Sequence, residues 1–324
     1  MANSRKSSSI DVVTRDLDDF LSRHVAPGQR VAIAYSGGLD SSVLLHCAAS
    51  LCGKHDIVLS TIHINHGLSP NAPLWATHCA DQSAALGIPH TAVNVNVGRG
   101  GAEGLEAAAR DQRYAVFSEL PVNWIALAHH LDDQAETLMH NLLRGTGVRG
   151  MAGMHPVRAN YLRPLLGIAR QQLMEYAQRN GLTWCEDESN DDLHYTRNYI
   201  RHAVMPVLET RYPSVALQLA ATASRFADAQ SLLEDLARVD AGDTPLSFPF
   251  PVTVLVALQS NRASNLLRCL LANNQLQAPS KVRLTEFVRQ VREARPDRHP
   301  QLDFGACTLR VKNRQLLLEL RAEP

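Results

Sequence analysis

Residues 30–51 read RVAIAYSGGLDSSVLLHCAASL, two apolar runs separated by a short loop of glycine and serine. The first run is short and continuous, as in a buried strand, and the second has the length of a helix. Gly37 and Gly38 have no Cβ, so their backbone can adopt positive φ and approach a ligand closely. Free N–H groups at the start of the following helix favour an anion. The stretch therefore predicts a phosphate-binding loop between a strand and a helix.

Asp40 distinguishes this loop from other phosphate loops. The pattern GxxxxGK[ST], typical of loops that act at the outermost phosphate, does not occur in the chain. A carboxylate that faces phosphates is unfavourable unless a divalent cation lies between them. The alternative is that Asp40 or Ser41 only caps the helix. We interpret Asp40 as a residue that helps to position Mg²⁺ beside bound phosphates.

Strand and helix patterns alternate through the first half of the chain. Short apolar runs predict strands at residues 30–36, 56–64, 90–97 and 123–130. Helical patterns precede and separate them, at residues 10–23, 41–51, 71–87, 104–120 and 132–144. Continuous apolar strands alternating with helices predict an α/β fold with a doubly wound parallel sheet covered on both faces.

The alternation ends near residue 190. Residues 211–239 predict one long helix, and residues 240–251 a loop with three prolines. Two helices follow, at 262–275 and 281–294, and residues 302–320 predict two strands joined at 312–313. We therefore expect a catalytic domain at 1–210, a helical linker and loop at 211–251, and a smaller α+β C-terminal domain at 252–324.

Charge and cysteine content narrow the class of protein. The net charge is zero, but residues 262–314 hold eleven Lys or Arg and four Asp or Glu, a difference of seven positive charges. That segment predicts a site for a polyanion or, alternatively, a solvated helix face. The six cysteines show no CxxC spacing, and no apolar run approaches the roughly 20 residues of a membrane span. We expect a cytoplasmic protein with reduced thiols and no membrane contact.

A second group of candidate functional residues follows the fourth predicted strand. Asp132, Asp133 and Glu136 begin the next helix, and the last two share one of its faces. The carboxyl edge of a doubly wound sheet is where such folds bind ligands, so these residues are expected beside the Ser36–Ser42 loop. The alternative is simple acidic capping of that helix. His129 and His130 lack a tetrahedral partner set, so we expect a structural or nucleotide-contacting role for them.

Several motifs in a fixed order resemble a known family. They are SGGLDSS (36–42), IHINHGLS (62–69), ARDQRY (109–114), AHHLDDQAET (128–137), LLRGTGVRGMAGM (142–154) and DESNDDLHYTRNYIRHAVMPVL (187–208). The first resembles the pyrophosphate loop (PP-loop) of the ATP-pyrophosphatase superfamily. The whole order resembles the tRNA(Ile)-lysidine synthetase family, strongly over residues 30–210 and more weakly beyond. The chain looks like a shorter form without the last C-terminal module, and it has Asn65 where the family often has Asp.

The resemblance implies a reaction. Members of this family use ATP and Mg²⁺ to adenylate the carbonyl oxygen on carbon 2 of the wobble cytidine in tRNA(Ile) with a CAU anticodon. Free L-lysine then displaces AMP to form lysidine, so the tRNA decodes AUA instead of AUG. The alternatives are a PP-loop tRNA thiolase, which would need paired or metal-binding cysteines, and a non-catalytic RNA-binding protein with a vestigial nucleotide site.

The resemblance also implies residue roles. The loop would hold ATP phosphates, His63 would lie near adenine, and residues 144–154 would close over the cytidine. Asp133 and Glu136 would recognise the substrate lysine. We expect Arg110 and Arg113 to contact phosphate or tRNA, and the alternative is a solvated basic stripe. We expect Arg197 and Arg201 to contact the anticodon or pyrophosphate, and the alternative is an ion pair with Asp191 or Asp192. The predicted catalytic residues are Asp40, Asp133, Glu136, Arg197 and Arg201; the predicted nucleotide-binding residues are Ser36, Gly37, Gly38, Leu39, Asp40, Ser41, Ser42, His63, Arg110 and Arg113.

Overall fold

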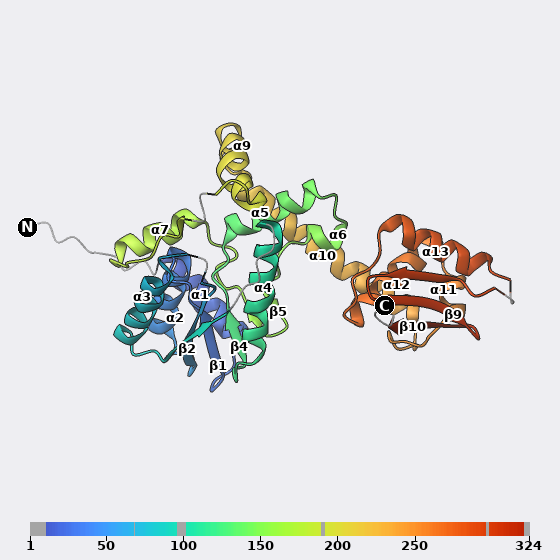
Figure 1. The fold of residues 1–324 in the computed structure, drawn as a ribbon, viewed down its shortest axis with the longest axis horizontal. Coiled ribbons are helices and arrows are strands. Elements are labelled where there is room, and N and C mark those ends of the chain that lie inside the picture. Colours follow the sequence, from blue (N-terminus) through green and yellow to red (C-terminus); the bar gives the residue numbers. More distant parts are fainter. Residues whose placement is uncertain (1–10, 68, 96–101, 189–191, 296–297, 321–324) are drawn as a thin grey trace, which may run out of the picture. The chain divides into compact units, whose positions relative to one another are not determined.

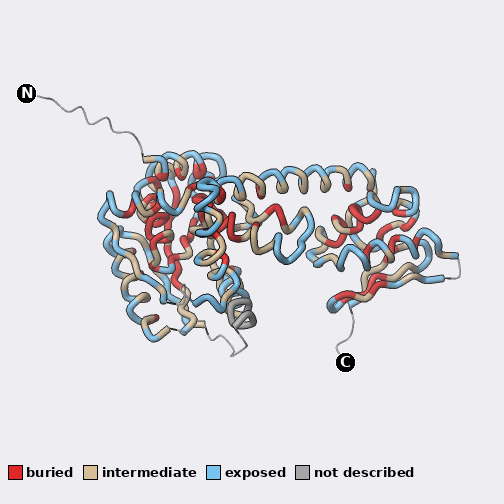
Figure 2. Tube along the Cα trace, turned by 90° about the horizontal axis from the view of Figure 1, so that it is seen from above, coloured by how far each residue is buried: buried red, intermediate tan, exposed pale blue. Residues whose placement is uncertain are grey.

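The computed structural model describes residues 11–67, 69–95, 102–188, 192–295 and 298–320, with the backbone alone for 102–107. The chain divides into two compact units, Met1–Ala227 and Asp228–Pro324. The division falls inside helix α10 (Val215–Ala241), part of the segment predicted as a linker (Figure 1). Each unit has its own buried interior (Figure 2).

A six-stranded sheet organises the first unit, in the order β3-β2-β1-β4-β6-β5. The strands are β1 (Arg30–Ala34), β2 (Val58–Asn65), β3 (His90–Asn94), β4 (Trp124–Ala126), β5 (Val157–Arg158) and β6 (Tyr161–Leu162). All neighbours pair in parallel except β5, which is antiparallel to β6. The predicted parallel α/β class is confirmed. The β5–β6 hairpin was not predicted, because two-residue strands carry no periodic signal.

Alternation along β1 places one core on each face of this sheet. Val31 and Ile33 belong to the core that includes residues of α1, α2 and α7. Ala32 lies in the opposite core with Phe117 of α4. Helices around the sheet are α1 (Val12–His24), α2 (Leu39–Leu51), α3 (Ala72–Ala85), α4 (Ala102–Ser118), α5 (Leu131–Leu143), α6 (Val148–Met151) and α7 (Arg170–Arg179). Apolar residues on both faces explain the continuous apolar runs of the strands.

The strand order creates a crevice between β1 and β4. From β1 the chain builds β2 and β3 on one side, and α4 then carries it back to β4 on the other side of β1. The order reverses between β1 and β4, the switch point at which open parallel sheets bind ligands. Their carboxyl ends lead into residues 36–42 and 127–136. The topology thus brings together the two segments that were predicted to hold the functional residues.

The last helices of this unit are short. They are α8 (Thr196–Tyr199), a π-helical turn (Ile200–Val204) and α9 (Met205–Arg211). The prediction of one helix from residue 211 is wrong at its start, since α10 begins at Val215. Pro213 explains the break: proline lacks an N–H donor and disfavours helical backbone at the residue before it.

The second unit packs helices on an antiparallel sheet with the order β7-β10-β9-β8. Its elements are β7 (Phe250–Pro251), α11 (Val252–Ala257), α12 (Ser260–Asn273), α13 (Lys281–Glu293), β8 (Gln301–Phe304), β9 (Cys307–Lys312) and β10 (Gln315–Leu320). The turn after Lys312 is confirmed, with positive φ at Asn313 and Arg314. The prediction of two strands over 302–320 is wrong, because Gly305, at φ +50°, makes a further turn that separates β8 from β9.

Two further sequence predictions concern the whole chain. All six cysteines are free thiols, four of them buried and two half-buried. Among the described helices, none has both the length and the apolar character needed to cross a membrane.

Candidate active site

The loop after β1 is held in shape by its own side chains and by a distant segment. The Oγ atoms of Ser36 and Ser41 lie 3.0 Å apart, and Ser41 Oγ donates to the Gly38 carbonyl at 3.0 Å. Gly37 has φ +84°, and a Cβ there would lie 3.0 Å from the sulfur of Cys79. The Gly37 carbonyl accepts from the N–H of Cys185 at 2.8 Å. Only glycine fits the backbone conformation at position 37. With the loop in this conformation, the start of α2 is open to an anion.

Asp40 lies in the first turn of α2 and has one oxygen without a partner. Its Oδ1 is buried and makes no hydrogen bond to any described residue, while Oδ2 lies 3.6 Å from Nε2 of His130. A buried carboxylate oxygen without a partner suits a cation. Across the described ranges, no group of three or more His, Cys, Asp or Glu could hold a metal ion. Mg²⁺ commonly uses one or two carboxylates together with substrate phosphates, so Asp40 fits Mg²⁺ that arrives with a nucleotide.

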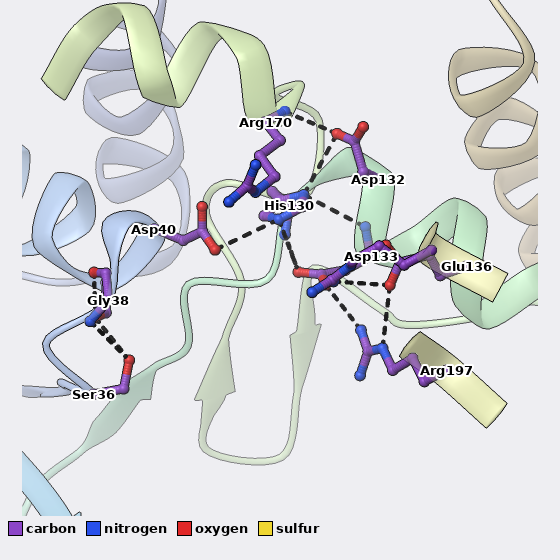
Figure 3. Close-up of polar contacts among 11 residues, drawn as sticks. Ser36, Gly38, Asp40, His130, Asp132, Asp133, Glu136, Arg170 and Arg197 are labelled. Atoms are coloured by element: carbon purple, nitrogen blue, oxygen red, sulfur yellow. Dashed lines mark hydrogen bonds and ion pairs between the residues drawn. The ribbon is translucent and has the colours of Figure 1, made fainter. Parts of the chain in front are cut away.

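His130 is buried at the centre of a carboxylate cluster (Figure 3). Besides Asp40, its ring nitrogens lie 3.5 Å from Oδ2 of Asp132 and 3.5 Å from Oδ2 of Asp133. Burial alone would lower the pKa of His130, but the three carboxylates outweigh it and raise that pKa to about 10. His130 is therefore an imidazolium at neutral pH. It links the loop after β1 to the first turn of α5.

Two arginines bind the carboxylates of Asp133 and Glu136. Asp133 Oδ1 accepts from Nη2 of Arg197 and from Nη2 of Arg201, each at 2.9 Å. Arg201 also binds Glu136 through two bonds, Nε to Oε1 at 2.7 Å and Nη2 to Oε2 at 2.9 Å. Burial would raise the pKa of Asp133, but His130 and Arg197 lower it to about 2. Asp133 is thus ionised, and both carboxylates are hydrogen-bonded although they are buried.

These contacts replace the ion pairs that had been the alternative for Arg197 and Arg201. Asp192 instead accepts from the backbone and ring of His194, and Asp191 lies outside the described residues. The cluster contains four carboxylates, of Asp40, Asp132, Asp133 and Glu136, and the three cations His130, Arg197 and Arg201. The formal charges of these seven side chains therefore sum to minus one.

A cleft of about 760 Å³ opens beside the cluster, within the first unit. Its volume lies in the range of roughly 300–1,000 Å³ that is usual for small-molecule sites. The predicted residues that line it are Ser36, His63, Arg113, Asp133, Arg197 and Arg201. Residues that were not predicted also line it, among them Trp75, Asp187, Glu188 and Tyr195. An aromatic residue next to carboxylates carries no distinct sequence signal, so only the tertiary structure reveals that wall.

Histidines on the cleft wall are uncharged. Burial lowers the pKa of His63, whose Nδ1 lies 3.0 Å from the Tyr35 carbonyl. Burial also lowers the pKa of His129, to about 3, and its Nδ1 has no hydrogen-bond partner among the described residues. Neutral imidazoles can donate or accept a hydrogen bond to a nucleobase without adding charge.

Of the two arginines predicted on α4, one lines the cleft and the other does not. Arg113 lines the cleft, whereas the guanidinium of Arg110 lies over the ring of Tyr114, 4.9 Å from its centre. Arg110 is exposed, so contact with the nucleotide remains a prediction for that residue.

The loop at 144–154 is tied to α5. Gln134 accepts from the Met154 N–H at 2.7 Å, and Asn141 donates to the Gly150 carbonyl at 2.7 Å. Residues 145–150 read GTGVRG, which matches the dinucleotide pattern GxGxxG. They follow a helix instead of a strand, so the structural context of that pattern is missing. Closure of this loop over a cytidine remains a prediction.

Comparisons with known proteins agree with this geometry. The model of the PP-loop domain matches residues 10–208, and that of the TilS substrate binding domain matches residues 250–317. A tRNA(Ile)-lysidine synthase of Alkalilimnicola ehrlichii is 42% identical over 299 residues, which cover 90% of this chain and 67% of that protein. One of Nitrosomonas europaea is 36% identical over 326 residues, covering 98% of this chain and 70% of that protein.

A solved structure with the same fold is more distant. The U34-tRNA thiolase NcsA from Methanococcus maripaludis, solved with its [4Fe-4S] cluster, superposes with a TM-score of 0.56. The identity is 19%, over 67% of this chain and 78% of that one, so the likeness concerns the fold alone. The two domain matches and the identities with named relatives lead to one assignment: the chain belongs to the tRNA(Ile)-lysidine synthase family.

Proposed function

We propose that the protein is a ligase that joins free L-lysine to carbon 2 of the wobble cytidine in tRNA(Ile) with a CAU anticodon, in the cytoplasm. The observation that carries the proposal is that Ser36 of the PP-loop and Asp133 of the carboxylate cluster line one cleft. Two half-reactions that share an activated intermediate need their sites side by side. A nucleotide at the loop and an amine at the cluster would meet on a cytidine between them.

ATP is the first substrate. The β and γ phosphates would lie at the N-terminus of α2, where the exposed hydroxyl of Ser36 can donate and the following backbone N–H groups face an anion. Asp40 would hold Mg²⁺, which supplies charge neutralisation for the phosphates when it is bound. The cytidine oxygen then attacks the α-phosphorus, and pyrophosphate leaves.

Lysine is the second substrate, and its amine must lose a proton before it attacks. With an ordinary pKa of about 10.4, the neutral amine at pH 7 costs roughly 4–5 kcal/mol. Asp133 and Glu136 would attract the ammonium group, since their carboxylate oxygens can accept hydrogen bonds from it. Their oxygens are shared with Arg197 and Arg201, which weakens their hold on the proton. Such a site can recognise lysine without keeping its amine permanently charged.

A tRNA is the largest partner in this reaction, and one end of the second unit suits its phosphates. The N–H of Val311 donates to the Pro300 carbonyl at 3.0 Å, which brings the β9–β10 turn next to the segment before β8. Arg298, Lys312 and Arg314 therefore gather at that end of the sheet, all exposed. We call these three residues the basic end. Each phosphate contact there would add salt-dependent affinity without sequence information.

Other basic residues of the segment 262–314 are less available. Arg289 makes ion pairs with Glu286 and Glu293 on the same helix, and Arg262 pairs with Asp240. Their charge is largely neutralised within the protein. The basic end is therefore the stronger candidate for RNA contact than the middle of α13.

A transfer assay tests the whole proposal. The protein is incubated with ATP, Mg²⁺, labelled lysine and unmodified tRNA bearing a CAU anticodon, and the tRNA is then digested to nucleosides. We expect a labelled nucleoside, with AMP and pyrophosphate released in equal amounts. Methionine tRNA, which also carries CAU, is the matched control and should remain unlabelled. Pyrophosphate release without transfer of the label, or no release at all, would contradict the proposal.

A further inference from the structure

Arg170 was absent from the sequence predictions, yet it begins the helix that closes the carboxylate cluster. It is the first residue of α7, and its backbone N–H donates to Oδ2 of Asp132 at 2.8 Å. Asp132 in turn contacts His130, which contacts Asp40 of the PP-loop helix. Figure 3 shows the side chain of Arg170 extending from this position toward Asp40 and His130. The backbone anchor thus aims a guanidinium at the phosphate-binding loop.

The charge of Arg170 has no counterpart within the part of the chain that is described. Its side chain is exposed and makes no hydrogen bond or ion pair there, whereas His130, Arg197 and Arg201 all contact carboxylates. The position is also unfavourable for α7, because a cation in the first turn opposes the helix dipole. No acidic residue lies in that first turn to compensate. A local role in helix stability therefore does not explain this arginine.

An anion at the PP-loop would explain it. The N-termini of α2 and α7 both lie at the cluster, and Oδ1 of Asp40 is buried without a partner at the same place. A planar guanidinium can bind two phosphate oxygens at once, which a hydrated lysine ammonium does less well. We infer that Arg170 binds the β or γ phosphate of ATP and stays bound to pyrophosphate as it leaves. This inference rests on the proposed function.

The chemistry of the step accounts for a cation at that place. An oxygen–phosphorus bond forms between the cytidine oxygen and the α-phosphorus, and the bond from that phosphorus to the oxygen bridging to the β phosphate breaks. The electron pair remains on this oxygen, so negative charge grows on the pyrophosphate. The guanidinium of Arg170 faces that growing charge, while the α phosphate leaves with AMP and does not need it.

A binding experiment with the full chain separates these phosphates. The dissociation constants of inorganic pyrophosphate and of AMP, both with Mg²⁺, are measured for the wild type, Arg170→Ala and Arg170→Lys. For Arg170→Ala we expect pyrophosphate to bind roughly 10- to 100-fold more weakly, as for the loss of a charge-assisted hydrogen bond, with AMP unchanged. Arg170→Lys should fall in between. Gln171→Ala, on the next residue of α7, is the matched control and should change neither constant.

Folding does not confound this test. The bond to Asp132 comes from the backbone of residue 170, so every variant can keep it. Equal pyrophosphate affinity in Arg170→Ala and the wild type would overturn the inference, as would an equal loss for AMP and pyrophosphate. The proposed function fails separately, if the wild type with tRNA and lysine releases no pyrophosphate.

Discussion

His130 offers a measurable link between the cluster and the stability of the first unit. Replacing it with glutamine removes an imidazolium that lies between three carboxylates, and leaves their negative charges facing one another. The pKa of His130 is about 10 in the folded protein and about 6.5 when its environment is lost. Below pH 6.5 both states carry the proton, and the full stabilisation is present. As the pH rises toward 10, folding must take up a proton, and the stabilisation is lost.

The size of the effect follows from the two pKa values. Each pKa unit corresponds to about 1.36 kcal/mol, so the whole interval from 6.5 to 10 corresponds to at most about 5 kcal/mol. Between pH 6.5 and pH 9.0 the free energy of unfolding of the wild type should fall by about 2.9 kcal/mol relative to His130→Gln, because the unfolded histidine is already half deprotonated at pH 6.5. Residues that titrate identically in both proteins cancel in this difference.

Tryptophan fluorescence in urea can follow this unit alone. All three tryptophans, Trp75, Trp124 and Trp184, belong to the first unit. His194→Gln is the matched control, because His194 also contacts an aspartate, at 3.0 Å, but with 90% of its side chain exposed. We expect the control to follow the wild type at every pH. A difference between wild type and His130→Gln that stays constant from pH 6.5 to 9.0 would refute the reasoning.

Three other predictions concern the reaction. Asp40→Asn should bind tRNA normally but release almost no pyrophosphate, because the buried oxygen can no longer hold a cation; turnover near the wild-type rate at saturating Mg²⁺ would contradict this. Glu136→Gln should raise the KM for lysine about tenfold or more while the tRNA adenylate still forms. An equal loss of adenylation would instead assign Glu136 a role in binding Mg²⁺. Replacing Arg298, Lys312 and Arg314 with alanine should weaken tRNA binding and flatten its salt dependence by about 0.7–0.9 per lost phosphate contact. An unchanged salt slope would exclude the basic end from RNA contact, and ATP affinity is the control.

The sequence carries the architecture of the first unit because its signals are local. Buried parallel strands are continuous apolar runs, so residues 30–36 and 56–64 were recognisable as strands without knowledge of their neighbours. The short hairpin β5–β6 has no comparable run. In the second unit, the turn at Gly305 was missed because the strands on either side read as one apolar stretch.

The site was predictable in its members but not in its contacts. Arg201 and Glu136 are 65 residues apart in the chain, and only the packing of the π-helical turn against α5 brings them together. The alternative partners considered for Arg197 and Arg201 were sequence neighbours, which is the usual choice when tertiary structure is unknown. Two arginines on one helical face and two carboxylates on another could have suggested the pairing by charge alone.

The hydrogen bond from the Cys185 N–H to the Gly37 carbonyl has a consequence for the order of events during synthesis. The strand, loop and helix from β1 to α2 leave the ribosome early, but this loop lacks its tether until residue 185 follows. The carboxylates of α5 likewise wait for Arg197 and Arg201 before their charges are paired. A nascent chain that stops before Arg201 contains all six strands of the sheet but lacks one arginine of the site. The enzyme therefore becomes competent only after nearly all of its first unit has been made.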